Sequence, residues 1–252
     1  MTDVVLGLIG FFVVFLSAAL MIGLAALQRK SPPAFREIPA FTRLHQAIGR
    51  VVEDGTRLHV SLGRGAIITP QSASALAGLT LLRRLAELTS AGDQPPIATS
   101  GDAALAILSQ DTLKTASQTS THGVYDPTAG RLTGLTPFSY AAGAIPAIRD
   151  ENISANVLMG NFGVEAALLT EAAERTNTFT LAASDNLVAQ AVLYATAQEP
   201  LIGEELYAAG AYMDAGSVHS ASLTVQDILR WLIIIVILLG ALVQLLKAVG
   251  IL

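Results

Sequence analysis

Two stretches of the chain decide its fold class. They are PPIATSGDAALAIL, from Pro95 to Leu108, and TFTLAASDNLVAQAVL, from Thr178 to Leu193. Each begins as a short apolar run, turns through Ser, Gly or Asp, and continues as an Ala- and Leu-rich helical segment. A strand that leads through a tight turn into a helix is the repeating unit of a parallel sheet. Both stretches therefore predict strand–turn–helix units of an α/β domain.

The same unit recurs elsewhere in the chain. Further strands are expected in RLHVSLG (57–63), RLTGL (131–135) and ISANVLMG (153–160), with helical segments between them. Four or five such alternations favour a doubly wound, Rossmann-like parallel sheet with helices on both faces. The strands are short and apolar, which is typical of sheets buried on both sides. Two helix starts are marked by Thr69–Pro70 and Thr136–Pro137, each an N-cap residue before a proline.

Composition indicates a membrane protein. Hydrophobic residues make up 52% of the chain and charged residues 14%, which is more apolar than a typical soluble domain. Two segments, Val4–Leu27 and Ile228–Leu246, approach the roughly 20 apolar residues that a membrane span requires. The first is predicted to be a retained anchor and not a cleaved signal peptide, because no Lys or Arg precedes it and its apolar run exceeds a typical signal core.

The predicted organisation has four parts, namely an N-terminal transmembrane anchor (1–28), a linker (29–37), the α/β domain (38–224) and a C-terminal transmembrane anchor (225–252). Arg29, Lys30 and Arg36 follow the first span, whereas only Asp3 precedes it. The positive-inside rule therefore predicts a cell (inner) membrane protein with its domain in the cytoplasm and both termini outside. Lys247, just after the second span, is contrary evidence.

Four blocks of the chain carry a family resemblance. They are VEDGTRLHVSLGRG, TPQSASALAGL, GRLTGLTPFSYAAG and LAASDNLVAQAVLYATAQEPLIGEELYAAGAY. In these blocks the chain resembles a family of uncharacterised bacterial membrane-anchored proteins with a central α/β domain of unknown function. The resemblance implies an anchored domain and carries over no functional residue.

The turns that follow the predicted strands are the candidate ligand site. In a parallel sheet such turns meet at the carboxyl edge, where small residues let backbone N–H groups approach an anion. Ser, Asp and Asn are also the standard helix N-caps, and Asp102 and Asp185 would repel a phosphate. Capping is the favoured interpretation, with anion binding as the alternative. The candidate residues are Gly63, Arg64, Gly65, Ser100, Gly101, Asp102, Gly160, Asn161, Gly163, Ser184, Asp185 and Asn186.

No catalytic or metal-binding motif is complete in the sequence. The turns match neither the G-x-G-x-x-G nor the Walker pattern, and the SDN at 184–186 lacks its S-x-x-K and K-T-G companions. The chain has no cysteine, and its four histidines are scattered. His122 and Asp126 are close enough in sequence to form a metal pair, but an exposed loop pair is favoured. We therefore predict no cofactor, no metal and no catalytic residues.

Charge is unevenly distributed along the chain. Residues 37–149 carry nine basic and eight acidic side chains, whereas residues 150–227 carry one basic and eleven acidic side chains. This acidic excess argues against nucleic acid and against broad docking on anionic lipid. It also suggests a head-to-tail contact in which the acidic half of one copy meets the more basic half of the next.

The spans contain residues suited to helix contacts. Ala19 and Gly23 are four residues apart, as are Gly240 and Gln244, so these positions are predicted to pack helices together within or between chains. No charge lies inside either span, which argues against a transporter. The leading prediction is a non-enzymatic scaffold, tethered to the lipid bilayer, that forms a homo-oligomer or recruits a membrane protein partner. The alternative is a small-ligand or nucleotide-binding domain that uses the strand-end turns.

Overall fold

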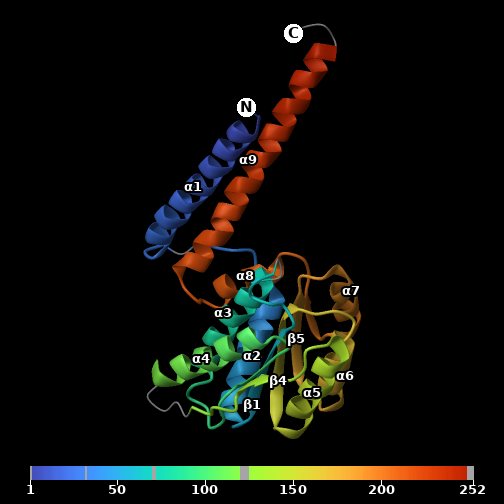
Figure 1. Ribbon diagram of the computed structural model, residues 1–252. Coiled ribbons are helices and arrows are strands. Elements are labelled where there is room, and N and C mark those ends of the chain that lie inside the picture. Colours follow the sequence, from blue (N-terminus) through green and yellow to red (C-terminus); the bar gives the residue numbers. More distant parts are fainter. Residues whose placement is uncertain (1, 32, 70–71, 120–124, 249–252) are drawn as a thin grey trace. The chain divides into compact units, whose positions relative to one another are not determined.

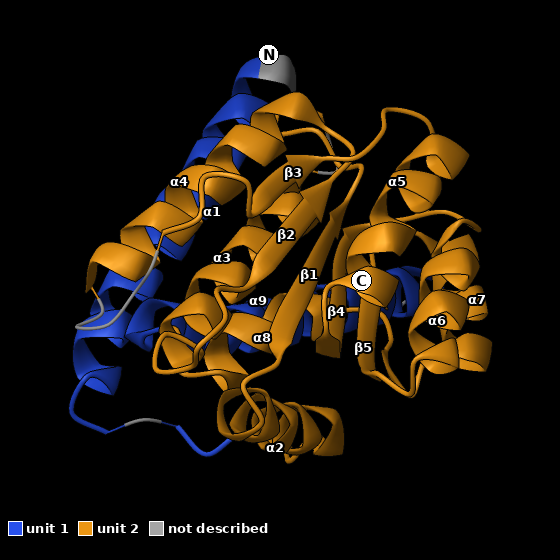
Figure 2. Cartoon of the chain, turned by 90° about the horizontal axis from the view of Figure 1, so that it is seen from below, with its two compact units in different colours: residues 1–35, 216–252 blue, residues 36–215 orange. Residues whose placement is uncertain are grey.

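The computed structural model describes residues 2–31, 33–69, 72–119 and 125–248. The chain divides into two compact units, which are coloured separately in Figure 2. One unit comprises residues 36–215, and the other joins residues 1–35 to residues 216–252. The boundary on the C-terminal side therefore falls at residue 215, ahead of the last helix.

The described part of the 36–215 unit contains a parallel sheet of six strands. Their order across the sheet is β3-β2-β1-β4-β5-β6, and every neighbouring pair is parallel. The chain order reverses between β1 and β4, which is the topological switch point of a doubly wound sheet. The predicted α/β class and parallel sheet are confirmed. The strands are β1 (Arg57–Gly63), β2 (Ile97–Ser100), β3 (Gly130–Leu132), β4 (Ile153–Asn161), β5 (Phe179–Ser184) and β6 (Glu199–Leu201).

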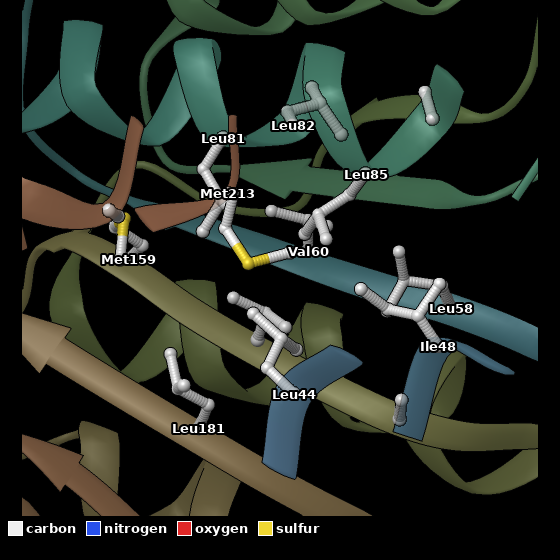
Figure 3. Close-up of a cluster of buried hydrophobic side chains, with 14 of the residues drawn as sticks. Leu44, Ile48, Leu58, Val60, Leu81, Leu82, Leu85, Met159, Leu181 and Met213 are labelled. Carbon is white, nitrogen blue, oxygen red and sulfur yellow. The ribbon is translucent and has the colours of Figure 1, made fainter. Parts of the chain in front are cut away.

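Helices cover both faces of this sheet (Figure 1). One face packs against α2 (Pro39–Glu53), α3 (Ser72–Leu88), α4 (Ala103–Thr119) and α8 (Glu205–Tyr212). The other packs against α5 (Pro137–Asp150), α6 (Ala166–Arg175) and α7 (Leu187–Thr196). Each face has its own apolar core. Figure 3 shows the first, in which Leu44 of α2 and Leu85 of α3 approach Val60 of β1.

Local sequence signals account for most element boundaries. Thr136 caps α5 in a reciprocal capping box with Ser139, which confirms the second Thr-Pro helix start. Residue 70 lies outside the described residues, so the first Thr-Pro start is not described; α3 begins at Ser72. Pro146 lies inside the 14-residue α5. Strand β6 was not predicted, because three residues with a central proline show no alternation and mark an edge strand.

Strands β1 and β4 approach each other closely at the switch point. Gly160 of β4 lies against the carbonyl of Leu62 in β1, and a Cβ at position 160 would collide with that oxygen. Gly63 at the end of β1 has a φ of +70°, and a Cβ there would collide with the carbonyl of Asn161. The backbones of β1 and β4 therefore touch at this end with no side chain between them. The Arg64 N–H donates to the Asn161 carbonyl at 2.9 Å and closes the ladder.

The beginning and end of the 36–215 unit are joined. Arg36 forms an ion pair with Glu205 of α8 at 2.8 Å, and its carbonyl accepts a hydrogen bond from the Tyr212 hydroxyl at 2.5 Å. The Tyr212 ring stacks on Phe41 with 4.9 Å between centroids. The two points at which the chain enters and leaves this unit are thus held together.

The second unit is a pair of packed helices, α1 (Thr2–Gln28) and α9 (Ser217–Ala248). Both are long and apolar enough to cross a membrane. The Gln28 amide donates to the Thr224 hydroxyl at 2.9 Å, and the partly buried side of α1 carries Leu20 and Leu24. The predicted small-residue positions lie elsewhere. Ala19 and Gln244 are exposed, and no described atom lies within 4 Å of a Cβ built on Gly23 or Gly240.

Replacing Gly160 tests the close strand contact. We expect Gly160→Ala to lower the free energy of unfolding by about 3 kcal/mol or more, because its methyl group has no space against a backbone carbonyl. The matched control is Gly203→Ala. Gly203 has a φ of +67° with open space around it, so only backbone strain of about 1 kcal/mol is expected. Denaturant unfolding of the detergent-solubilised chain measures both, and equal losses would contradict the contact.

Candidate functional site

The structure brings the four predicted turns to one edge of the sheet. Gly63 is paired in register with Asn161, and Gly160 with Ser184. The Gly101 N–H donates to the Gly63 carbonyl at 2.8 Å, which joins the turn after β2 to the turn after β1. The candidate residues therefore form one continuous layer over the carboxyl ends of β2, β1, β4 and β5. This is the place where doubly wound sheets bind ligands.

Several backbone donors in this layer are already used inside the protein. The Gly63 N–H donates to the Tyr140 hydroxyl at 3.3 Å, and the Arg64 and Gly101 N–H groups donate to carbonyls of neighbouring turns. The N–H groups of Phe162 and Asn186 both donate to the Ser184 hydroxyl, at 3.1 and 3.2 Å. A phosphate needs several free N–H groups pointing at it. These five N–H groups are therefore not free to bind one.

An ion pair fills the crevice above β1 and β4. The Arg64 Nε donates to Glu165 Oε1 at 3.1 Å, and the Glu165 side chain is only 1% exposed. The aliphatic part of Arg64 packs against Gly101, and the Glu165 carboxylate packs against Gly163. These glycines therefore make room for side chains of the same protein. The guanidinium that was a candidate for anion binding already has an anionic partner.

Asp185 closes the neighbouring part of the layer. Its carboxylate accepts hydrogen bonds from the Ser74 hydroxyl of α3 at 2.8 Å and from the Asn161 amide at 2.7 Å. Three elements are thereby joined at one carboxylate. Asp185 and Glu165 place two negative side chains at the position where a phosphate would have to enter, and this favours exclusion of anions.

Other candidate residues act as helix caps. The Asp102 carboxylate accepts from the Leu105 N–H at 2.9 Å, and the Asn186 side chain accepts from the Val188 N–H at 2.9 Å. The Ser100 hydroxyl donates to the Asp102 carbonyl at 3.1 Å. Gly65 is buried in the turn after β1. These contacts agree with the capping interpretation of the turns.

A buried polar network lies beneath the layer and was not predicted. The Tyr140 hydroxyl is 2.5 Å from the Ser61 hydroxyl, while His59 contacts the Asn156 side chain at 2.7 Å and the Thr99 hydroxyl at 2.9 Å. All five side chains are fully buried. Burial lowers the pKa of His59 to about 4 and raises the pKa of Tyr140. The signal in the sequence was the two-residue spacing of His59 and Ser61, which places both on one face of β1.

A charged cluster lies near the opposite, amino ends of β1 and β4. Glu151 pairs with Arg57 at 2.9 Å and with Arg131 of β3, and Asp126 lies 3.6 Å from Arg57. The hydrogen bond from Arg131 lowers the pKa of Glu151, and the hydrogen bond from Thr128 lowers the pKa of Asp126. His122, the other member of the considered metal pair, lies outside the described residues. Among the described residues no group of three His, Asp or Glu side chains is placed to hold a metal.

Fold and site together define the class of this protein. It is a doubly wound α/β domain with a buried ion pair at the carboxyl edge of its sheet, flanked in the sequence by two long apolar helices. The chain belongs to the DUF6754 family, a domain of unknown function, whose match covers residues 4–251. No curated protein and no solved structure matches the chain.

The buried ion pair gives a direct stability test. We expect Arg64→Ala to lower the free energy of unfolding by about 3–5 kcal/mol, because it leaves the buried Glu165 carboxylate without its cation. Arg175→Ala is the control, since its pair with Glu171 is exposed on both sides and should contribute less than about 0.5 kcal/mol. The double change Arg64→Met with Glu165→Leu should recover most of the loss. Chemical denaturation measures all three.

His59 predicts a specific pH dependence of stability. The unfolded histidine binds a proton below about pH 6.5 and the folded one only below about pH 4, so the unfolded state holds more protons between these values. Stability should therefore fall by about 2–3 kcal/mol from pH 7 to pH 4.5. His59→Gln should remove this slope, whereas Asp126 and Glu151, whose pKa values are lowered, lose their contribution mainly below this range. An unchanged slope in the variant would contradict the assignment.

Proposed function

We propose that this chain is a non-enzymatic, membrane-tethered scaffold whose α/β domain assembles with further copies of itself or recruits membrane protein partners. The observation that carries the proposal is the closed carboxyl edge. Arg64 and Glu165 fill the crevice, and the Ser184 hydroxyl together with strand-end carbonyls accepts from several of the turn N–H groups. The edge that serves ligands in other doubly wound sheets is here used for internal contacts.

The attachment of the domain at both of its ends supports a role as a scaffold. The contacts of Arg36 with Glu205 and Tyr212 join its first and last residues. Two packed apolar helices, α1 and α9, flank it in the sequence and are suited to a hairpin in the bilayer. A domain tethered in this way can move only along the membrane surface. The local concentration of the domain is therefore high, and weak contacts between copies become effective.

Some of the charges that suggested two opposite faces are paired inside one domain. Basic residues of the first half pair with acidic residues of the second half inside the same domain. These pairs are Arg36–Glu205, Arg43–Glu199, Arg57–Glu151, Arg64–Glu165 and Arg131–Glu151. Because four of the acidic side chains are neutralised within the chain, a head-to-tail contact between the two halves of different copies has a weaker basis than the linear count implied.

A second candidate function is binding of a nucleotide or another small ligand. The strand order β3-β2-β1-β4-β5-β6 is that of dinucleotide-binding domains, and the candidate turns lie at its switch point. Binding there requires the Arg64–Glu165 pair to separate and the approach of an anion to Asp185. Both requirements cost free energy, so this function ranks second.

We propose that the protein lies in the cell (inner) membrane, with its α/β domain in the cytoplasm and both termini outside. The chain has no native cysteine, so Ala195→Cys on α7 introduces a single exposed thiol. We expect a membrane-impermeant maleimide to label this thiol in inverted vesicles and to leave it unlabelled in intact cells. Labelling in intact cells alone would reverse the orientation.

Self-assembly is tested on the full chain in detergent and in nanodiscs. We expect a mass above that of one chain at both low and high salt, because the charged pairs are satisfied within each copy. NAD and ATP should leave the melting temperature of the same sample unchanged, since a ligand of the folded state raises it by mass action. A monomer in both media whose melting temperature rises with nucleotide would replace the scaffold by the ligand-binding function.

A further inference from the structure

The carboxyl edge of the sheet exposes large apolar side chains around the closed crevice. Ile68 is 96% exposed in the turn after β1, and Leu187 is 79% exposed where α7 begins after β5. Leu135 and Phe138 after β3, Val164 after β4, and Val188 beside Leu187 are also exposed. We refer to these six side chains as the carboxyl-edge strip.

The strand order brings these side chains to one edge of the sheet. They follow β3, β1, β4 and β5, which are four of the five consecutive strands from β3 to β5 in the sheet. The strand ends are in register, as the pairs Ser100–Leu132 and Gly160–Ser184 show. At about 4.8 Å per strand, the strip extends for roughly 19 Å along the edge.

The strip is large for a surface that faces only water. Six side chains with these exposed fractions present on the order of 700 Å² of accessible area, whereas the largest apolar patch of a typical monomer is about 300–600 Å². Each partner in an interface of standard size contributes about 800 Å². The area is thus sufficient for a specific interface with another protein.

The six side chains of the strip carry no charge, and the turns beside them hold one cation against the three carboxylates of Glu165, Asp102 and Asp185. Among the described residues of the turns at this edge, Arg64 is the one cation, and it is paired with Glu165. Asp102 and Asp185 are engaged in hydrogen bonds inside the domain. The contact surface of two such strips is supplied by uncharged side chains, and the excess of carboxylates beside it disfavours an anionic surface. A lipid surface would gain no attraction from basic side chains here, and this argues against the membrane as the occupant.

We propose that the carboxyl-edge strip is a homotypic interface that packs against the same strip of a second copy about a two-fold axis. A two-fold contact needs a surface complementary to itself, and a neutral apolar strip of this area meets that need. The inference rests on the proposed scaffold function and specifies its contact surface. The contact excludes water from apolar side chains, so salt does not dissociate it.

The first test compares two substitutions on α7 in the full chain. Leu187→Glu places a charge in the strip and should weaken dimerisation in nanodiscs or detergent at least ten-fold, because the charge is buried against apolar groups of the second copy. Tyr194→Glu is the matched control. Tyr194 is 73% exposed and lies seven residues further along the same helix, outside the strip, so its dimerisation should be unchanged. Melting temperatures show that both variants are folded.

The second test places a single cysteine in the naturally cysteine-free chain. Ile68→Cys lies near the middle of the strip and should form a disulfide-linked dimer in intact membranes on mild oxidation, whereas Ala195→Cys should not. A fluorophore attached to the thiol of the Ile68→Cys variant tests the alternative that the membrane covers the strip. Quenching of this fluorophore by nitroxide-labelled lipid would show that the membrane covers the strip and would overturn the proposal.

The outcomes separate the interface from the function. If the wild-type chain is monomeric in membranes, both proposals are contradicted, namely the scaffold function by self-assembly and the interface at the carboxyl-edge strip. A wild-type oligomer that Leu187→Glu leaves intact, or that high salt dissociates, retains the scaffold and overturns the strip. An oligomer that Leu187→Glu dissociates, that Tyr194→Glu leaves intact and that salt does not affect supports both.

Discussion

The structure depends on the backbone contact between β1 and β4 at the switch point. Gly63 and Gly160 have no side chain, so the two strands can approach closely here. A Cβ at either position would collide with a backbone carbonyl of the other strand. β1 and β4 are the central strands of the sheet, and both apolar cores are built on them. The same contact draws the turns after β1 and β4 together. Arg64 and Glu165, which lie in those turns, therefore meet across the gap and fill it.

An ion pair at this position changes what the fold can do. In a dinucleotide-binding domain the first turn offers free N–H groups to a pyrophosphate. Here the N–H groups of Gly63 and Arg64 have internal partners, and Glu165 supplies the negative charge that a ligand would otherwise bring. A buried carboxylate paired with a partly exposed guanidinium adds little net stability compared with apolar side chains. Removing only one partner of the pair, however, destabilises the protein because the other charge is left uncompensated. The arrangement favours a permanently closed crevice.

Much of this fold could be predicted from sequence, and the failures have physical reasons. β1 matched its predicted residues because Leu58, Val60 and Leu62 alternate with polar residues and a glycine ends the strand. β6 was missed because an edge strand of three residues is formed by its neighbour and not by a pattern of its own. The position of the candidate turns at one edge follows from the parallel order. That the turns are filled could not be predicted, because the contact of Arg64 with Glu165 joins residues 101 positions apart.

The distribution of charge also depends on contacts between residues that are distant in the sequence. A linear count separates a mixed first half from an acidic second half, and it suggested two opposite faces. The sheet order places the halves side by side, with β3-β2-β1 from the first and β4-β5-β6 from the second, and they meet where β1 lies beside β4. Their charges therefore meet as pairs across β1 and β4, as Arg57–Glu151 and Arg64–Glu165 do. The exposed apolar side chains at the carboxyl edge, such as Ile68 and Leu187, are a feature of the surface that the linear charge count did not indicate.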